Sequence, residues 1–332
     1  MTNHGNMYGP NFTFLGIERC DLDKPETFKD ADVVIVGAPI DSGTSHRSGA
    51  KFGPQAIRMG DYLPHDGERP HLALRTDGLK DLKVVDAGDL IMNGGDLVGS
   101  LKLLEAATEK ISKAGAIAVV LGGDHSIASA DVAGIANHRG KGKVSMIHFD
   151  AHADTGADQF GALVGHGTPM RRLIENGHVR GDRFLQLGLR GYWPDDATLN
   201  WMRDQGMRSY EMTEIHHRGL KTVLDESFSI LTDGCDGVFL SVDIDVVDPG
   251  MAPGTGTPEP GGMTSRELLE AVRRICLELP IVGIDVVEVA PPFDSADITA
   301  ILANRVVLEA LSAIALRKKG GTYSPTKNLL DR

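Results

Sequence analysis

The chain has few cysteines, few aromatic residues and no excess of positive charge. Its three cysteines, Cys20, Cys235 and Cys276, are far apart in the sequence, which excludes a disulfide framework and a Cys-x-x-Cys metal site. Such sparse use of cysteine suits a reducing cytoplasm. The 46 acidic residues outnumber the 34 basic ones and leave a formal net charge of −12. This balance disfavours nucleic acid or an anionic membrane as a partner and favours a cationic ligand.

Long apolar runs are also missing. No stretch approaches the roughly 18 uninterrupted apolar residues of a membrane span, and the N-terminus lacks the basic and apolar regions of a signal peptide. We therefore expect a cytoplasmic protein. Hydrophobic residues make up 41% of the 332 residues, which is enough for a sizeable core although only 5% of residues are aromatic.

Short runs rich in Val, Ile and Leu alternate with longer stretches of helical periodicity. The predicted strands are residues 33–36, 83–86, 117–121, 144–149, 184–189, 208–210, 237–244 and 281–287. The predicted helices are residues 53–60, 97–113, 126–137, 168–176, 220–231, 265–278 and 298–317. This alternation is typical of an α/β protein whose buried parallel strands are covered by helices.

The order of these elements favours one domain. Residues 30–318 contain no composition break, flexible linker or internal repeat. We predict an N-terminal arm over residues 1–30, a single catalytic domain over residues 31–318 and a loose tail over residues 319–332.

Polar residues follow several of the predicted strands, where parallel sheets bind their ligands. Residues 122–126 read Gly-Gly-Asp-His-Ser, and the two glycines allow a sharp turn that presents His125. Residues 150–154 read Asp-Ala-His-Ala-Asp, so Asp150, His152 and Asp154 alternate with alanines. In extended backbone this period of two points all three to one side, and small residues also let the backbone curl around an ion if the strand has already ended.

A second acidic pair ends the seventh predicted strand. Asp243 and Asp245 are expected to share one face of an otherwise apolar strand, and two adjacent buried carboxylates require a counter-cation to remain ionised. Glu288 follows the last predicted strand and adds another carboxylate at the same edge. Among the neighbouring candidates, His148 and Asp124 are interpreted as groups that orient ligands, and Asp248 as a turn former.

The charge of this set predicts two divalent ions. Two neutral imidazoles and four carboxylates carry a formal charge of −4, which two divalent cations balance. Two ions can share a bridging water and lower its pKa. Oxygen-rich ligation favours Mn²⁺, with Ni²⁺, Co²⁺, Fe²⁺ and Zn²⁺ as alternatives. The predicted ligands are His125, Asp150, His152, Asp154, Asp243 and Asp245.

Taken together, these motifs resemble the ureohydrolases, the arginase and agmatinase family. The three segments at residues 122–126, 150–154 and 241–249 occur in the family's order, and the likeness spans about residues 30–316. The resemblance implies a three-layer α/β/α sandwich with an eight-stranded, mainly parallel sheet. It also implies a two-manganese site in which Asp150 and Asp243 bridge the ions.

The same resemblance assigns catalytic roles. His166 matches the family's proton-shuttling histidine, Glu288 matches the carboxylate that grips the guanidinium, and Asp154 would relay a proton to the leaving amine. Guanidinium is a poor electrophile, so its hydrolysis requires a strong nucleophile, fixed carboxylates around the N–H groups and a proton for the departing amine. The products would be urea and an amine.

The substrate is predicted from smaller differences. Asp154 is followed by Thr155 and Gly156 rather than by the Ile-Asn of arginases, so arginine is disfavoured. Agmatine, giving putrescine and urea, is the first choice, and guanidinobutyrate, guanidinopropionate or another guanidine compound is the alternative. Ala290 and Phe293 depart from the Ser and Tyr of many agmatinase-like sequences, which we interpret as tuning the pocket toward a less polar substrate.

Two other functions compete with this interpretation. A non-catalytic metal-binding subunit that supports an active paralogue would retain the same ligands. Two-metal phosphoester hydrolysis is disfavoured because no basic phosphate clamp lies near the motifs. By family analogy alone we expect a homo-oligomer, a trimer or a hexamer.

Overall fold

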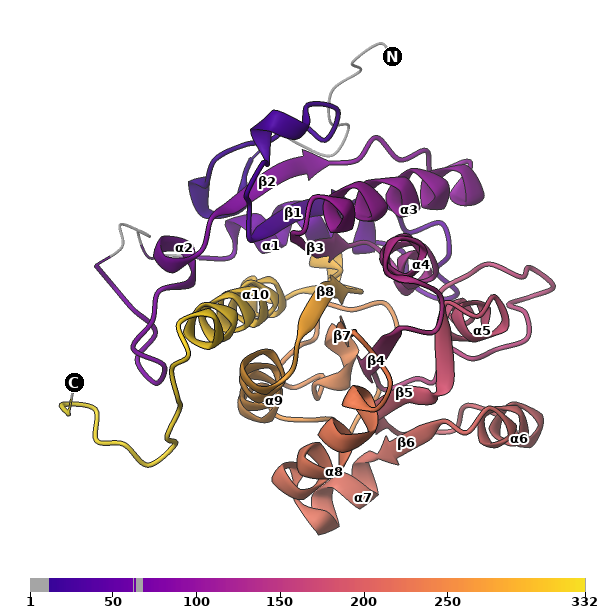
Figure 1. Ribbon diagram of the computed structural model, residues 1–332. Helices are drawn as coiled ribbons and strands as arrows, with labels where there is room; N and C mark the ends of the chain where they lie inside the picture. The colour runs from indigo at the N-terminus through magenta and orange to yellow at the C-terminus, as the bar shows by residue number, and fades with distance from the viewer. Residues whose placement is uncertain (1–11, 62, 64–67, 332) are drawn as a thin grey trace.

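The structure is a computed structural model and describes residues 12–61, 63 and 68–331. Its centre is an eight-stranded sheet with strand order β2-β1-β3-β8-β7-β4-β5-β6 (Figure 1). Neighbouring strands are parallel throughout. The strands are β1 Val33–Ala38, β2 Val84–Asp89, β3 Ile117–Gly122, β4 Val144–Phe149, β5 Val179–Leu189, β6 Arg208–Glu211, β7 Gly237–Asp243 and β8 Ile281–Val287.

The predicted strands are all present, with shifted ends. β5 begins at Val179 rather than at residue 184, because Val179 also pairs with Val144 across an irregularity in the register. β2 extends to Asp89, which pairs with Gly37 of β1. Such additions follow from pairing across the sheet, which apolar runs do not reveal.

Helices cover both faces of the sheet (Figure 1). They are α1 Gly53–Met59, α2 Gly78–Asp81, α3 Leu97–Lys113, α4 Ala128–Arg139, α5 Pro169–Glu175, α6 Asp196–Asp204, α7 Met212–Arg218, α8 Leu220–Thr232, α9 Ser265–Glu278 and α10 Ile298–Lys318. One buried cluster joins α3, α4 and α5 to side chains such as Val34 and Val120, and the other joins α1, α8, α9 and α10 to side chains such as Ile35 and Val119. Successive residues of one strand therefore enter opposite cores, and the three-layer α/β/α prediction is confirmed.

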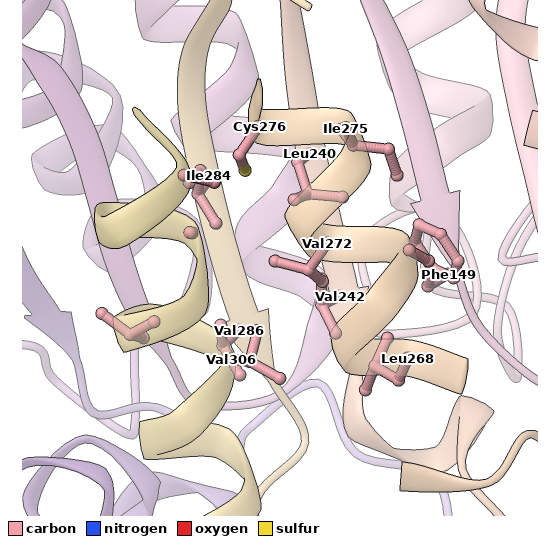
Figure 2. Close-up of a cluster of buried hydrophobic side chains, with 14 of the residues drawn as sticks. Phe149, Leu240, Val242, Leu268, Val272, Ile275, Cys276, Ile284, Val286 and Val306 are labelled. Carbon is pink, nitrogen blue, oxygen red and sulfur yellow. The ribbon is translucent and has the colours of Figure 1, made fainter. Parts of the chain in front are cut away.

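Helix α9 illustrates how the sequence produces this packing. Thr264 and Glu267 form a capping box at its start, which satisfies free backbone N–H groups there. Leu268, Val272 and Ile275 recur at helical spacing and are fully buried. Figure 2 shows these side chains beside Leu240 and Val242 of β7 and Phe149 of β4.

Three short helices were not predicted, namely α2, α6 and α7. Helix α6 buries only Thr198 and Met202, and α7 buries only Ile215. Their apolar stripes are too short to produce a clear helical period, whereas local caps such as Asp195, which accepts from the Thr198 N–H, define their starts.

Helix α10 is long and apolar enough to span a membrane by length and composition, but 78% of its apolar window is buried inside the protein. It packs against α9, α2 and α1. Asn304 at its centre donates to the carbonyl oxygen of Ile57, 2.9 Å away. Its apolar character is therefore accounted for by the core of this chain.

The segments outside the main domain also contact it. Phe14 is fully buried, and its N–H donates to the Asp86 carboxylate at 2.7 Å. Near the other end, Tyr323 accepts a hydrogen bond from Arg273, and Arg75 donates to the carbonyl oxygen of Leu329. The division into arm, domain and tail stays a prediction.

Helices α3 and α4 approach each other closely at Gly134. A Cβ atom at this position would lie 2.2 Å from the carbonyl oxygen of Glu105 and 2.2 Å from Oγ1 of Thr108. The first of these is a backbone atom of the neighbouring helix, so it cannot move without displacing α3. Only glycine allows this approach.

We expect Gly134→Ala to destabilise the fold by about 1–3 kcal/mol, the usual cost of overpacking. The free energy of unfolding in denaturant measures the change. Gly94→Ala is the matched control, because its Cβ would meet nothing closer than Oγ of Ser42 at 3.7 Å. If Gly134→Ala is no more harmful than Gly94→Ala, the proposed helix contact is wrong.

Candidate metal centre and active site

Four adjacent strands, β3, β8, β7 and β4, bring the predicted site residues to one edge of the sheet. His125 begins the 3₁₀ turn after β3, and Asp150 directly follows β4. Asp243 is the last residue of β7, and Glu288 directly follows β8. Because parallel strands end at the same edge, the strand order alone makes these side chains neighbours.

The first half of the site surrounds His125. Its Nδ1 atom lies 3.1 Å from Oδ2 of Asp150, 3.1 Å from Oδ2 of Asp154 and 3.2 Å from Oδ2 of Asp243. Its other nitrogen, Nε2, lies 2.9 Å from Oγ of Ser241. The imidazole therefore directs one nitrogen at three carboxylates while a hydroxyl group holds the other.

The second half surrounds His152. Its Nδ1 atom lies 3.1 Å from Oδ2 of Asp245 and 3.5 Å from Oδ1 of Asp150. Asp150 thus faces His125 with one oxygen and His152 with the other, so it lies between the two halves. The structure brings all six predicted ligands together, and their assignment as metal ligands stays a prediction.

The local backbone differs from an extended strand. β4 ends at Phe149, and Asp154 adopts a left-handed conformation with φ of 52°, so the curled alternative for this segment is the observed one. The expectation that Asp245 shares a strand face with Asp243 is wrong. Asp245 lies in the 3₁₀ turn Ile244–Val246, where its N–H donates to Oδ1 of Asp243 at 2.8 Å.

The electrostatics of the site require a counter-charge. Burial, together with the neighbouring carboxylates of Asp245 and Asp150, raises the pKa of Asp243 well above its usual value. Burial and Asp150 likewise raise the pKa of Asp245. Burial lowers the pKa of His152, but the Asp245 and Asp150 carboxylates outweigh it and raise that pKa to about 12. Without another cation, protons on the histidines are what balances this negative charge.

Divalent ions fit the same donor set. One group of ligand atoms within 4.8 Å of one another comes from His125, His148, Asp150 and Asp154, and another comes from Asp150, His152 and Asp245. Asp150 belongs to both groups. Asp243 is in neither group, although its Oδ2 lies 3.2 Å from Nδ1 of His125. Buried carboxylates and imidazoles of this kind suit divalent ions, which would take the place of the imidazole protons.

The positions of His148, Asp124 and Asp248 agree with supporting roles. Nε2 of His148 lies 2.8 Å from Oδ2 of Asp150, while its Nδ1 lies 3.1 Å from Nε2 of Gln186. Since the amide of Gln186 donates to Nδ1, Nε2–H is free to donate to Asp150. Asp124 accepts from the N–H groups of Gly43 and Ser126. Asp248 accepts from the Gly250 N–H in a turn and from the Gly261 N–H of the following loop.

His166 and Glu288 form a second feature beside the cluster. Nδ1 of His166 lies 2.9 Å from Oε1 of Glu288, which also accepts from the His125 N–H at 2.9 Å. Burial lowers the pKa of His166, but the carboxylates of Glu288, Asp154 and Asp124 together outweigh burial and raise that pKa to about 9. The Ser45 N–H donates to Nε2 of His166 at 3.0 Å, which favours the neutral imidazole. The contact with Glu288 therefore favours the protonated form of His166, and the contact with Ser45 favours the neutral form.

The second oxygen of Glu288 has no partner although the residue is 1% exposed. Glu288 also adopts a left-handed backbone conformation, with φ of 61°. A buried carboxylate oxygen without a donor is costly, and strained backbone concentrates at functional sites. Both observations indicate an acceptor prepared for a ligand with N–H donors.

The glycine-rich loop at residues 254–262 passes next to Glu288. Arg47 donates to the carbonyl oxygens of Thr255 and Gly256, at 2.7 and 3.1 Å. Its guanidinium lies 4.3 Å above the ring of Phe293. A Cβ at Gly256 would lie 3.8 Å from Oε2 of Glu288, so this loop passes close to the unpartnered oxygen.

Sequence reasoning missed several side chains that hold the site. Ser45 contacts His166 through both its N–H and its hydroxyl, and Ser241 contacts His125. Ser45 lies in the loop after β1, so the rule that strand ends gather at one edge was a usable signal. Gln186 lies inside β5, and only the pairing of β5 with β4 brings it to His148.

Comparisons with known proteins agree with this geometry. The Arginase family model matches residues 31–313. The chain is 37% identical over 296 residues to a guanidinobutyrase of Pseudomonas aeruginosa, covering 88% of this chain and 89% of that protein. It is 38% identical over 305 residues to an agmatinase of Cronobacter sakazakii, covering 92% and 94%. A crystal structure of a hypothetical agmatinase from Burkholderia thailandensis is similar, with a TM-score of 0.82, 33% identity and coverage of 95% and 94%.

We expect Mn²⁺ at about 100 times its Kd to stabilise the metal-free protein by about 2.7 kcal/mol, because it binds the folded state. Thermal unfolding with and without Mn²⁺ measures the effect as a rise in Tm. At one fixed Mn²⁺ concentration, the rise should be larger at pH 8 than at pH 6, since the proton on His152, whose pKa is about 12, must leave before the metal binds.

Asp243→Asn should remove most of the rise in Tm. Asp248→Asn is the matched control: this aspartate follows the same strand but accepts from the N–H groups of Gly250 and Gly261 and belongs to neither group of ligand atoms, so its rise should equal that of the wild type. An equal rise in both variants would mean that Mn²⁺ binds elsewhere.

Proposed function

The chain belongs to the arginase family, whose amidinohydrolases are hydrolases acting on C–N amidine bonds, and we propose that this guanidino hydrolase converts agmatine to putrescine and urea. The observation that carries the proposal is the unpartnered buried oxygen of Glu288 beside a cluster of four carboxylates and two imidazoles. A guanidinium group is cationic, planar and rich in N–H donors, so it complements both the charge and the free acceptor.

Each residue around Glu288 and the carboxylate cluster would have its own role in the hydrolysis. Two divalent ions, held by His125, Asp150, His152, Asp154, Asp243 and Asp245 in the set described above, would supply Lewis acidity and lower the pKa of water. Glu288 would hold the guanidinium and orient its carbon. Oδ2 of Asp154 lies 3.1 Å from His125 on the inner side of the cluster, and Asp154 would pass a proton to the departing amine.

His166 would exchange protons between the site and solvent. It is 8% exposed, whereas Glu288 beneath it is 1% exposed, so the imidazole lies between the buried carboxylate and the outside. The contact with Glu288 favours its protonated form and the contact with Ser45 favours its neutral form. A group balanced in this way is suited to taking up and releasing a proton in each turnover.

Agmatine is preferred over arginine and over acidic guanidines for reasons of charge. Agmatine carries a second cationic amine, and this chain is strongly acidic overall, with a net charge of −12. The similarity to an agmatinase supports the same choice. Thr155 and Gly156 after Asp154, in place of the arginase pattern, argue against arginine.

Guanidinobutyrate and related guanidino acids form the second candidate class, because of Arg47. Its guanidinium lies over Phe293 and on the loop next to Glu288, where it would attract a carboxylate at the far end of a substrate. The similarity to a guanidinobutyrase supports this alternative. We further propose Mn²⁺ as the metal, a cytoplasmic location and a homo-oligomeric assembly.

Urea release from a panel of guanidines tests the function. With Mn²⁺-loaded protein, we expect the highest kcat/KM with agmatine, lower values with guanidinobutyrate and guanidinopropionate, and the lowest with arginine. Glu288→Gln should lower kcat/KM by roughly 100-fold or more, because hydrogen bonds to charged groups are worth about 1.5–3 kcal/mol each.

Glu278→Gln is the matched control, since Glu278 is exposed at the end of α9 and pairs with Arg274, and its activity should equal that of the wild type. Highest activity with a guanidino acid would select the second substrate class. If the metal-loaded protein releases no urea from any guanidine, the catalytic proposal is wrong and the non-catalytic metal-binding subunit is favoured. Release of phosphate from a phosphoester would instead favour the phosphatase alternative.

We expect the double substitution Ala290→Ser and Phe293→Tyr to change substrate preference. Ala290 is buried beside Gly49, and Phe293 lies under Arg47, so two added hydroxyls would make this region more polar. The ratio of kcat/KM for agmatine to that for guanidinobutyrate should change by roughly threefold or more. An unchanged ratio would remove these two residues from the determinants of specificity.

A further inference from the structure

Two buried carboxyl groups face each other behind the metal-binding cluster, and neither has been assigned a role above. Asp131 projects from α4 and Asp285 from β8, and both are fully buried. After burial, the Asp285 carboxylate is the strongest influence on the pKa of Asp131, and α4 packs against β8. Oδ2 of each carboxyl is buried without a hydrogen-bond partner.

A hydrogen bond between the two groups requires a proton. Two carboxylate oxygens offer only lone pairs, so they cannot form a hydrogen bond unless one of the groups is protonated. Two ionised carboxylates in contact in a buried site would also repel each other strongly. One proton shared by the pair would remove this repulsion and would give the two unpartnered Oδ2 atoms a hydrogen bond.

The proton belongs to Asp131. Oδ1 of Asp285 accepts from Oγ of Ser241 at 2.8 Å and from the Val242 N–H at 3.2 Å, so this carboxyl already acts as a double acceptor. Asp131 has only the N–H of its own neighbour, Val132. Burial and the Asp285 carboxylate raise the pKa of Asp131 well above its usual value, whereas His125 and His148 partly offset the effect of burial on Asp285.

The direction of these hydrogen bonds also determines which nitrogen of His125 carries the proton. The Ser241 hydroxyl donates to Asp285, so its lone pair is left to accept from Nε2–H of His125, 2.9 Å away. With its proton on Nε2, His125 presents the lone pair of Nδ1 to the space among Asp150, Asp154 and Asp243. This is the tautomer that a metal ion needs.

We propose that Asp131 is a positioning residue that keeps its carboxyl proton and donates it to Asp285, so that Asp285 and Ser241 hold His125 in the metal-binding tautomer. Without this donor, the buried Asp285 would take up a proton of its own and donate it to Ser241. Ser241 would then donate to Nε2 of His125, which would move the imidazole proton to Nδ1. The proposal rests on the proposed function in that His125 is taken to bind a metal.

Replacing Asp131 by two residues of similar size, Asn and Leu, separates the loss of the hydrogen bond from a change in side-chain volume. Asn at position 131 still offers an N–H to Asp285, whereas Leu offers none. In competition with a chelator, Asp131→Asn should bind Mn²⁺ within about threefold of the wild type, and Asp131→Leu should bind it about tenfold or more weakly at one of two sites. If Asp131→Leu binds Mn²⁺ as tightly as the wild type, or if Asp131→Asn is impaired as much as Asp131→Leu, the positioning role is wrong.

Infrared difference spectra test the proton directly, even if Asp131→Leu does not fold. The spectrum of Mn²⁺-loaded wild type minus that of loaded Asp131→Asn should contain the C=O stretching band of a protonated carboxylic acid. Absence of this band would overturn the proposal. Neither readout uses urea release, so a failure of the proposed hydrolysis with a normal Asn–Leu difference would leave the role of Asp131 standing.

Discussion

The charge balance of one buried cluster governs the organisation of this protein. Asp150, Asp154, Asp243 and Asp245 are removed from water at the edge of the sheet, where the effective dielectric constant is low and repulsion between carboxylates is strong. Such a cluster persists only with compensating cations, whether imidazole protons or metal ions. This requirement explains why hydrogen-bond donors surround the cluster and why the unpartnered oxygen of Glu288 suits a cationic ligand.

The fold meets the requirement by holding each acidic group on rigid backbone. The predicted metal ligands extend from the ends of β3, β4 and β7, and β8 lies between β3 and β7. The left-handed residues Asp154 and Glu288 redirect the chain at two of these ends. Their conformational cost, on the order of 1–3 kcal/mol each, is borne by a sheet whose strands are buried on both faces. The buried strands thus hold the two strained residues at the edge of the sheet in their left-handed conformations.

Much of this could be predicted from the sequence, because the signals are local. Buried parallel strands are read as apolar runs, and ligand pairs such as Asp150 and His152 lie close together in the chain. Contacts that depend on how the strands pair across the sheet could not be predicted from the sequence. The contact of Ser45 with His166 joins residues 121 positions apart. Asp131 reads as an ordinary polar residue of a helix until β8 brings Asp285 against it. The turn at Asp245 also lacked a local signal, because Ile244 and Val246 on either side are typical of strands.

The central position of β8 has a consequence for the order of assembly. β3 and β7 are neighbours only through β8, which is nearly the last element of the chain to leave the ribosome. Until residues 281–287 are synthesised and inserted, the first three strands and the block of β4 to β7 have no shared sheet, and His125 stays apart from Asp243. The group of Asp150, His152 and Asp245 can form within the β4–β7 block, whereas His125 joins Asp150, Asp154 and Asp243 only after β8 is in place. A C-terminally truncated chain would therefore retain one half of the predicted site and lack the other.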